Sequence, residues 1–221
     1  MDESKSQVFR CYVRKRPGFD VEAQGLCRDL REQLGIGGLD GLTIFNRYDM
    51  EGVDPAVYAQ ARETVFSEPQ VDAVYDEDFP RPAGSHSILA VEALPGQFDQ
   101  RSDSAGQCVQ LMTGGERPLV AYAKVYVLEG VLSVPELDKI RGYLINPVEC
   151  REAALDKPDT LARAYGAPDR VAVLDGFTAL DGAGLQAELD RLGLAMDLDD
   201  LTFLQAYFRD EEKRDPTITE V

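Results

Sequence analysis

Short runs rich in β-branched and aromatic residues predict three strands in the first third of the chain, at residues 8–14, 42–48 and 71–75. The first gap carries leucines at helical spacing, Leu26, Leu30 and Leu34, and then a glycine cluster that predicts a helix end. In the second gap Asp54 precedes Pro55, a capping residue followed by proline at the first helical position, which predicts a helix toward Phe66.

The same order of elements is predicted again after a stretch of linker composition at residues 76–86. Apolar, β-rich runs predict strands at 87–93 and 119–128, and helical patterns cover 99–112 and about 134–144. The chain therefore reads as strand, helix, strand, helix twice in succession.

Six identities share one sequence offset of 78 residues and fall at equivalent turn positions of the two stretches. They are Pro17/Pro95, Gly18/Gly96, Tyr48/Tyr126, Glu51/Glu129, Gly52/Gly130 and Pro69/Pro147. Turn chemistry alone could place proline and glycine in both halves, but it tolerates other spacings. The common offset favours an internal duplication, and we expect two halves to pack about a pseudo-twofold axis as two subunits of a dimer would.

The pattern changes after about residue 155. A loop-like stretch precedes a strand-like run at 171–177, a helix at 184–194 with Leu185, Leu189 and Leu192 on one face, and a last helix at 197–214. The sequence thus predicts an α+β protein with a domain at 1–155, whose halves are 1–78 and 84–155, followed by a mostly helical linker domain at 156–221.

Composition narrows the classes of function. Forty acidic and twenty-three basic residues give a net charge of −17, which repels nucleic acid and anionic lipid, so we expect neither partner. The first ten residues lack an apolar signal core, and no stretch approaches the length of a membrane span, so a cytoplasmic location is expected. The scattered cysteines, Cys11, Cys27, Cys108 and Cys150, are expected to be reduced thiols.

No spacing assigns a catalytic, cofactor-binding or metal-binding residue. His86 is the only histidine and lies in the predicted linker, where a solvated ring is the commoner outcome. Cys108 lacks a readable histidine partner and is expected to be a buried helical thiol. Asp197, Asp199 and Asp200 are interpreted as capping the last helix, and the mixed charges of residues 209–215 as its solvated end. The glycines of LGIGGLDG follow a helix, which favours helix termination over phosphate binding.

Several segments in order along the chain resemble the amino-terminal region of single-chain bacterial phosphoribosylformylglycinamidine synthase. They are KRPGFDVEAQGL at 15–26, NRYDMEG at 46–52, ETVFSEPQVDAVYDE at 63–77, ALPGQFDQRSDSAGQCVQL at 93–111, KVYVLEG at 124–130, YLINPVECREA at 143–153, LGLAMDLDDLTFLQAYF at 192–208 and RDPTITEV at 214–221. In that family the first region is similar to a tandem copy of the small subunit of the multi-chain enzyme, and a helical linker domain leads into the synthetase domain.

The resemblance implies a non-catalytic portion of a purine-biosynthetic ligase and glutamine amidotransferase. The family's next landmark, an Asp-His-Cys-x-His motif, has no match here, so we expect no activity from this chain alone and no cofactor bound to it. ATP and magnesium belong to the full enzyme, in which the synthetase and glutaminase domains are the implied partners and ammonia passes between their active sites. The alternative is a free-standing binding module with a ferredoxin-like layout that responds to an effector.

Overall fold

The computed structural model describes residues 7–162 and 170–221. The chain forms two compact units, Met1–Arg163 and Ala164–Val221, which are described separately. The first is an antiparallel sheet with four helices, and the second is a small, largely helical unit. The protein is therefore α+β, as the sequence predicts.

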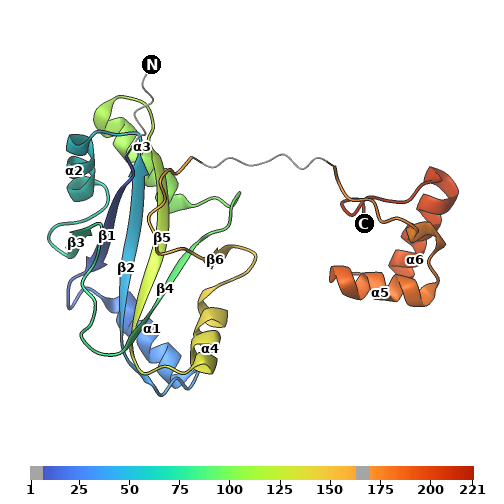
Figure 1. Ribbon diagram of the computed structural model, residues 1–221, viewed down its shortest axis with the longest axis horizontal. Coiled ribbons are helices and arrows are strands. Elements are labelled where there is room, and N and C mark those ends of the chain that lie inside the picture. Colours follow the sequence, from blue (N-terminus) through green and yellow to red (C-terminus); the bar gives the residue numbers. More distant parts are fainter. Residues whose placement is uncertain (1–6, 163–169) are drawn as a thin grey trace. The chain divides into compact units, whose positions relative to one another are not determined.

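The first unit is built on a six-stranded sheet in the order β3-β1-β2-β5-β4-β6, in which every neighbouring pair is antiparallel (Figure 1). The strands are β1 (Phe9–Lys15), β2 (Leu39–Glu51), β3 (Asp72–Asp76), β4 (His86–Ala93), β5 (Leu119–Gly130) and β6 (Cys150–Glu152). The two long strands, β2 and β5, pair at the centre of the sheet.

The four helices of the first unit lie in the gaps between strands in which the sequence predicts them. They are α1 (Val21–Glu32), α2 (Pro55–Thr64), α3 (Gln100–Thr113) and α4 (Val134–Leu144). Asp54 caps α2 as predicted, because its Oδ1 accepts hydrogen bonds of 2.9 Å from the amides of Ala56 and Val57. Gly114 ends α3 in the left-handed conformation that glycine adopts freely.

Two hydrophobic cores lie between the sheet and the helices, on one face of the sheet. Each core combines one helix from each half of the unit: α2 with α3, and α1 with α4. Tyr48 and Met50 of β2 point into the first core, and Tyr126 and Leu128 of β5 into the second. Because side chains alternate along a strand, the intervening residues point to the other face.

The other face of the sheet carries a third core, whose strand residues include Tyr12, Phe45 and Val125. The segments that follow β3 and β6 cover this face, since Phe79 and Ala153 are both buried within the cluster. The predicted linker after β3 thus supplies packing as well as a connection.

The pairing of strands in the second half repeats that of the first with every residue number raised by 78. Phe9 faces Met50 as Ser87 faces Leu128, and Val13 faces both Asn46 and Val74 as Val91 faces both Lys124 and Glu152. At the centre, Asn46 of β2 faces Lys124 of β5, two residues that are themselves 78 apart. The two halves of the sheet therefore meet about an axis that passes through this pair.

The glycines of LGIGGLDG allow a close approach between the loop after α1 and the end of β5. A Cβ atom added to Gly130 would lie 2.0 Å from the carbonyl oxygen of Gly38, and one added to Gly38 would lie 2.3 Å from that of Val131. Gly35 adopts φ +67°, as expected of a residue that terminates a helix. These glycines serve packing and helix termination.

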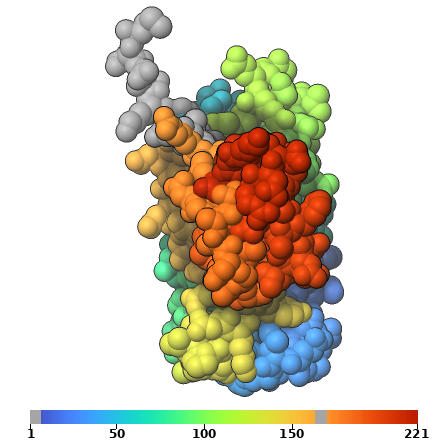
Figure 2. Space-filling model, turned by 90° about the vertical axis from the view of Figure 1, so that its right-hand side faces the viewer, coloured from blue at the N-terminus to red at the C-terminus, as the bar shows by residue number. Residues whose placement is uncertain are grey.

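The second unit contains a 3₁₀ turn (Phe177–Ala179), α5 (Gly182–Leu192), α6 (Leu198–Tyr207) and a π-helical turn (Phe208–Glu212). Its described residues, orange to red in Figure 2, pack around Phe177, Leu185 and Leu201. The strand predicted at 171–177 is wrong, because only a single bridge forms there, from Val173 to Thr217. The last predicted helix is also divided, since its final turn widens into the π-helical turn.

Two side-chain predictions need correction. Cys108 is exposed, because it lies on the outer side of α3 and not on the side that Ala105 and Val109 present to the core. His86 is the first residue of β4 and not a linker residue, although its Nδ1 is only 2.9 Å from the carbonyl oxygen of Gly84 in the linker itself.

Candidate functional site

A group of charged residues lies buried on the sheet face that has no helices. Arg10 of β1 and Asp49 of β2 form a bidentate pair, with Nε to Oδ1 at 2.5 Å and Nη2 to Oδ2 at 2.8 Å. Arg47 lies two residues from Asp49 on the same face, and its Nε is 3.6 Å from Oδ2 of Asp49. Burial lowers the pKa of Arg47, and the negative charge of Asp49 opposes this.

The remaining hydrogen-bonding capacity of this group is directed at the segment after β6. Arg47 and Arg10 each donate a bond of 2.6 Å to the carbonyl oxygens of Ala154 and Leu155 respectively. Glu51 accepts bonds from the Leu161 amide at 2.5 Å and from the Thr160 hydroxyl at 2.9 Å. We call residues 154–161 the strap. These charges hold the strap against the sheet.

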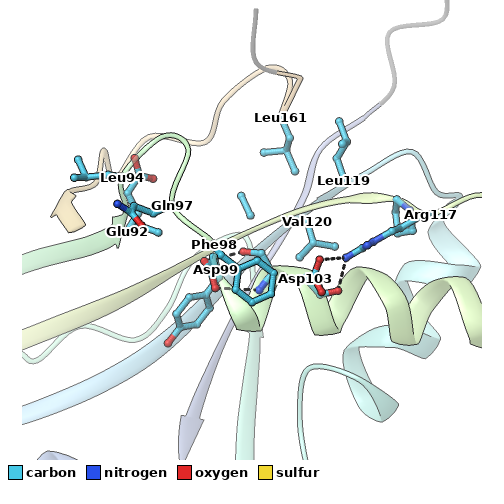
Figure 3. Close-up of a pocket in the computed structure, with 15 residues that line it drawn as sticks. Glu92, Leu94, Gln97, Phe98, Asp99, Asp103, Arg117, Leu119, Val120 and Leu161 are labelled. Atoms are coloured by element: carbon cyan, nitrogen blue, oxygen red, sulfur yellow. Dashed lines mark hydrogen bonds and ion pairs between the residues drawn. The ribbon is translucent and has the colours of Figure 1, made fainter. Parts of the chain in front are cut away.

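A groove of about 390 Å³ lies beside the strap, between the start of α3 and the adjoining strands (Figure 3). Leu161 lies on the opposite side of the groove from α3. Phe98 is 75% exposed and Leu119 is 47% exposed, which gives the groove an apolar rim.

Each acidic side chain that lines this groove has a structural partner. Asp99 accepts bonds from the amides of Arg101 and Ser102 and so caps α3. Asp103 pairs with Arg117 at 2.6 Å, and Glu92 pairs with Arg151 at 2.7 Å. The groove can thus receive an apolar side chain, and its carboxylates are already engaged in holding the fold.

The residues that the sequence offered as candidates for chemistry have separate roles in the structure. All four cysteines are free. Asp197 and Asp200 form a capping box at the start of α6, as predicted. Asp215 binds the amides of Gly176 and Thr178, so it holds the 3₁₀ turn and is not part of a solvated helix end. Within residues 7–162 and 170–221, no group of three or more histidine, cysteine or acidic side chains is arranged to hold a metal ion.

Sequence reasoning did not single out the buried charges of Arg10, Arg47, Asp49 and Glu51. The strand predicted at 42–48 ends before Asp49 and Glu51; in the structure β2 extends to Glu51, so positions 47, 49 and 51 alternate along one strand and share a face. A strand face that carries charged residues is usually exposed to solvent. In this sheet the main chain of the strap covers it.

None of the helices in the described part of the chain is long and apolar enough to cross a membrane. The fold defines a class of α+β protein: a six-stranded antiparallel sheet with helices on one face in the first unit, and a small, largely helical second unit. No protein-family model matches the sequence, and no curated protein matches it.

Proposed function

We propose that this chain is a scaffold, the non-catalytic amino-terminal portion of phosphoribosylformylglycinamidine synthase. The observation that carries the proposal is the register of the sheet, which repeats at an offset of 78 residues in all the strand pairs of the two halves. A tandem copy of a small subunit that pairs with itself through its central strand would have this arrangement. We infer that the two halves arose by duplication.

In the proposed scaffold the role of the strap is structural, because it is held firmly against the sheet. Three buried charged side chains, Arg10, Arg47 and Glu51, form hydrogen bonds to the strap, and charge-assisted hydrogen bonds are stronger than those between neutral groups. In the proposed enzyme, the sheet and the helical unit hold the glutaminase against the synthetase, where ATP and magnesium act. Ammonia released from glutamine then reaches the activated amide without protonation and loss in water.

The test is complementation. The 221-residue chain is assayed for glutamine-dependent and ammonia-dependent amidine formation, alone and mixed with the separately produced remainder of the synthase. We expect no turnover by the chain alone and restored glutamine-dependent turnover on mixing. Turnover by the chain alone, or full glutamine-dependent turnover by the remainder alone, would contradict the scaffold. No effect on mixing two folded pieces would favour the free-standing binding module.

A further inference from the structure

A second cavity, of about 450 Å³, lies on the helix-bearing face of the first unit, close to the pair Asn46–Lys124. Its lining includes Phe98, Arg101, Tyr122, Lys124, Tyr126 and Cys150. The volume falls within the range of pockets that take small organic ligands, roughly 300–1,000 Å³. The cavity adjoins the groove beside the strap and shares part of its lining, including Phe98, Asp99 and Tyr122. Arg101, Lys124 and Tyr126 line the cavity and not the groove.

Arg101 is a cation with unused hydrogen-bonding capacity. Its Nη1 donates to the hydroxyl of Tyr48 at 3.3 Å, and its guanidinium lies 5.3 Å from the centre of the Tyr122 ring. No carboxylate pairs with its side chain among the residues that the structure describes. A guanidinium has five N–H donors in a planar fork that suits the oxygens of a carboxylate or a phosphate. Arg101 is therefore held in place by aromatic rings while most of its donors remain available.

Tyr126 adds a second donor. The residue is only 8% exposed, yet its hydroxyl has no hydrogen-bond partner among the described residues. Burial, together with the negative charge of Glu22, raises the pKa of Tyr126 to about 12, so the hydroxyl keeps its proton at neutral pH. Because Tyr126 lines the cavity, its hydroxyl can donate a hydrogen bond to the oxygen of a ligand bound there.

The acidic side chains near the cavity are either engaged with other groups or exposed to solvent, so they do not prevent an anion from binding there. Lys124 pairs with Glu22 at 2.6 Å, but the Glu22 side chain is 65% exposed and such pairs are weak in water. Asp99 caps α3, and Glu92 is held by Arg151. Glu149, on the rim, is exposed.

The equivalent place in the first half has different residues and a smaller cavity. The residues 78 positions earlier than Arg101, Lys124 and Phe98 are Ala23, Asn46 and Asp20, and the cavity there is only about 70 Å³. The small cavity of the first half is lined by other cations, Arg14 and Lys15, but only the second half has an arginine at the position of Arg101 and a cavity of about 450 Å³.

We propose that the cavity binds a small organic anion, a carboxylate or a phosphate ester, through Arg101 and Tyr126, with an apolar body against Phe98. The anionic oxygens accept hydrogen bonds from the guanidinium and the hydroxyl, and Lys124 adds charge. The proposal does not depend on the scaffold role, because it concerns one cavity of the first unit.

Calorimetric titration of the full chain with phenyl phosphate, benzoate and inorganic phosphate tests this directly. We expect saturable binding of at least one probe in the millimolar range, about −4 kcal/mol. Arg101→Gln should weaken it about tenfold and Tyr126→Phe about threefold, because each removes a donor to the anion. Tighter binding of phenyl phosphate assigns a phosphate ester as the ligand class, and tighter binding of benzoate assigns a carboxylate.

The matched control is Arg117→Gln, which removes one positive charge from the neighbouring groove and should leave the affinity within about twofold. Circular dichroism checks that each variant is folded. Should Arg101→Gln not fold, Arg101→Lys, which keeps the charge but loses the fork, and Tyr126→Phe carry the test. Absence of saturable binding up to about 20 mM, or an equal loss in the Arg117→Gln control, would overturn the proposal.

Discussion

Asp49 forms ion pairs with two buried guanidinium groups, those of Arg10 and Arg47, on the sheet face that carries the strap. Its charge offsets the cost of burying Arg10, whose side chain is 2% exposed. A buried pair of this kind gives little net stability relative to apolar residues, but the loss of one partner leaves an uncompensated charge. The importance of Asp49 therefore becomes visible on substitution.

Asp49→Asn should lower the free energy of unfolding by about 3–5 kcal/mol, because Arg10 and Arg47 would face each other without a counter-charge. Urea denaturation followed by circular dichroism measures the change. The control is Asp103→Asn, which breaks an ion pair with Arg117 that is partly open to solvent and should cost about 1 kcal/mol or less. Equal effects of the two substitutions would mean that the buried pair does not stabilise the first unit as described.

Cys11 couples stability to alkaline pH. Burial, reinforced by the charge of Asp76, raises the pKa of its thiol from 9.0 to about 12. The folded state thus keeps a proton that the unfolded state releases, so this contribution is complete below pH 9 and is lost as the pH rises to 12. The expected slope is about 1.4 kcal/mol per pH unit within this window.

Urea midpoints between pH 8 and pH 11 test the coupling. Cys11→Ala should be less stable at pH 8, where a cavity is left, and should lose stability more slowly as the pH rises. Cys108→Ala serves as the control, since Cys108 is exposed and its removal should leave the wild-type slope. Parallel profiles of stability against pH for Cys11→Ala and the wild type would rule out the coupling. The raised pKa of Tyr126 contributes to the pH dependence of stability above pH 10 in all three proteins.

At the scale of elements, the end of each central strand is shaped by a glycine, but the two are under different constraints. Gly52 follows β2 with φ +90°, and its nearest neighbour to an added Cβ is 4.0 Å away. Gly130 ends β5 with φ +124°, and an added Cβ would meet the carbonyl oxygen of Gly38 at 2.0 Å. The backbone conformation disfavours a side chain at both positions, but only at Gly130 would a side chain also block a close approach of two backbone segments.

Gly52→Ala should cost about 1–2 kcal/mol through backbone strain alone. Gly130→Ala should cost distinctly more, because the loop that contains Gly38 must also move away from β5. Thermal unfolding of the two variants under the same conditions gives the comparison, with the equivalent glycine of the other half as the matched control. If the two thermal midpoints fell equally, the loop that contains Gly38 could move away from Gly130 at no cost, and the close contact would not hold the loop in place.

The sequence predicted elements best where a single periodicity and a capping signal agree, as in α2 with Asp54 and Pro55. It failed at residues 171–177, where a β-rich run has only one bridging partner, and at Cys108, where helical periodicity did not reveal which side of α3 faces the core. The buried charges were missed because their partners are main-chain atoms of a strap more than a hundred residues away. Such pairing depends on the tertiary fold and leaves no local pattern.

At the scale of the molecule, the first unit distributes its packing over three clusters, and the two on the helix side each draw helices from both halves. Neither half could bury its own helices alone in this arrangement, because α2 shares a core with α3 and α1 shares one with α4. The paired strands β2 and β5 consequently form the interface between the two halves at the centre of the sheet.

The net charge of −17 acts on the whole chain and sets its response to salt. Like charges repel one another most in the compact state, and salt shortens the range of that repulsion to about 8 Å at physiological ionic strength. We therefore expect the thermal midpoint to rise by a few degrees, roughly 3–6 °C, as sodium chloride increases from about 10 to about 300 mM. The buried pair Arg10–Asp49 should be little affected, since it is shielded from the solvent ions.

Glu116→Gln and Glu149→Gln together provide the sharper version of this experiment. Both side chains are exposed and have no ion-pair partner among the residues that the structure describes, so their removal reduces repulsion without breaking a contact. The double variant should have a higher midpoint at low salt and a smaller rise with salt than the wild type. A midpoint that falls as salt is added would mean that surface ion pairs outweigh the excess of negative charge, and the acidic surface would then be a source of stability.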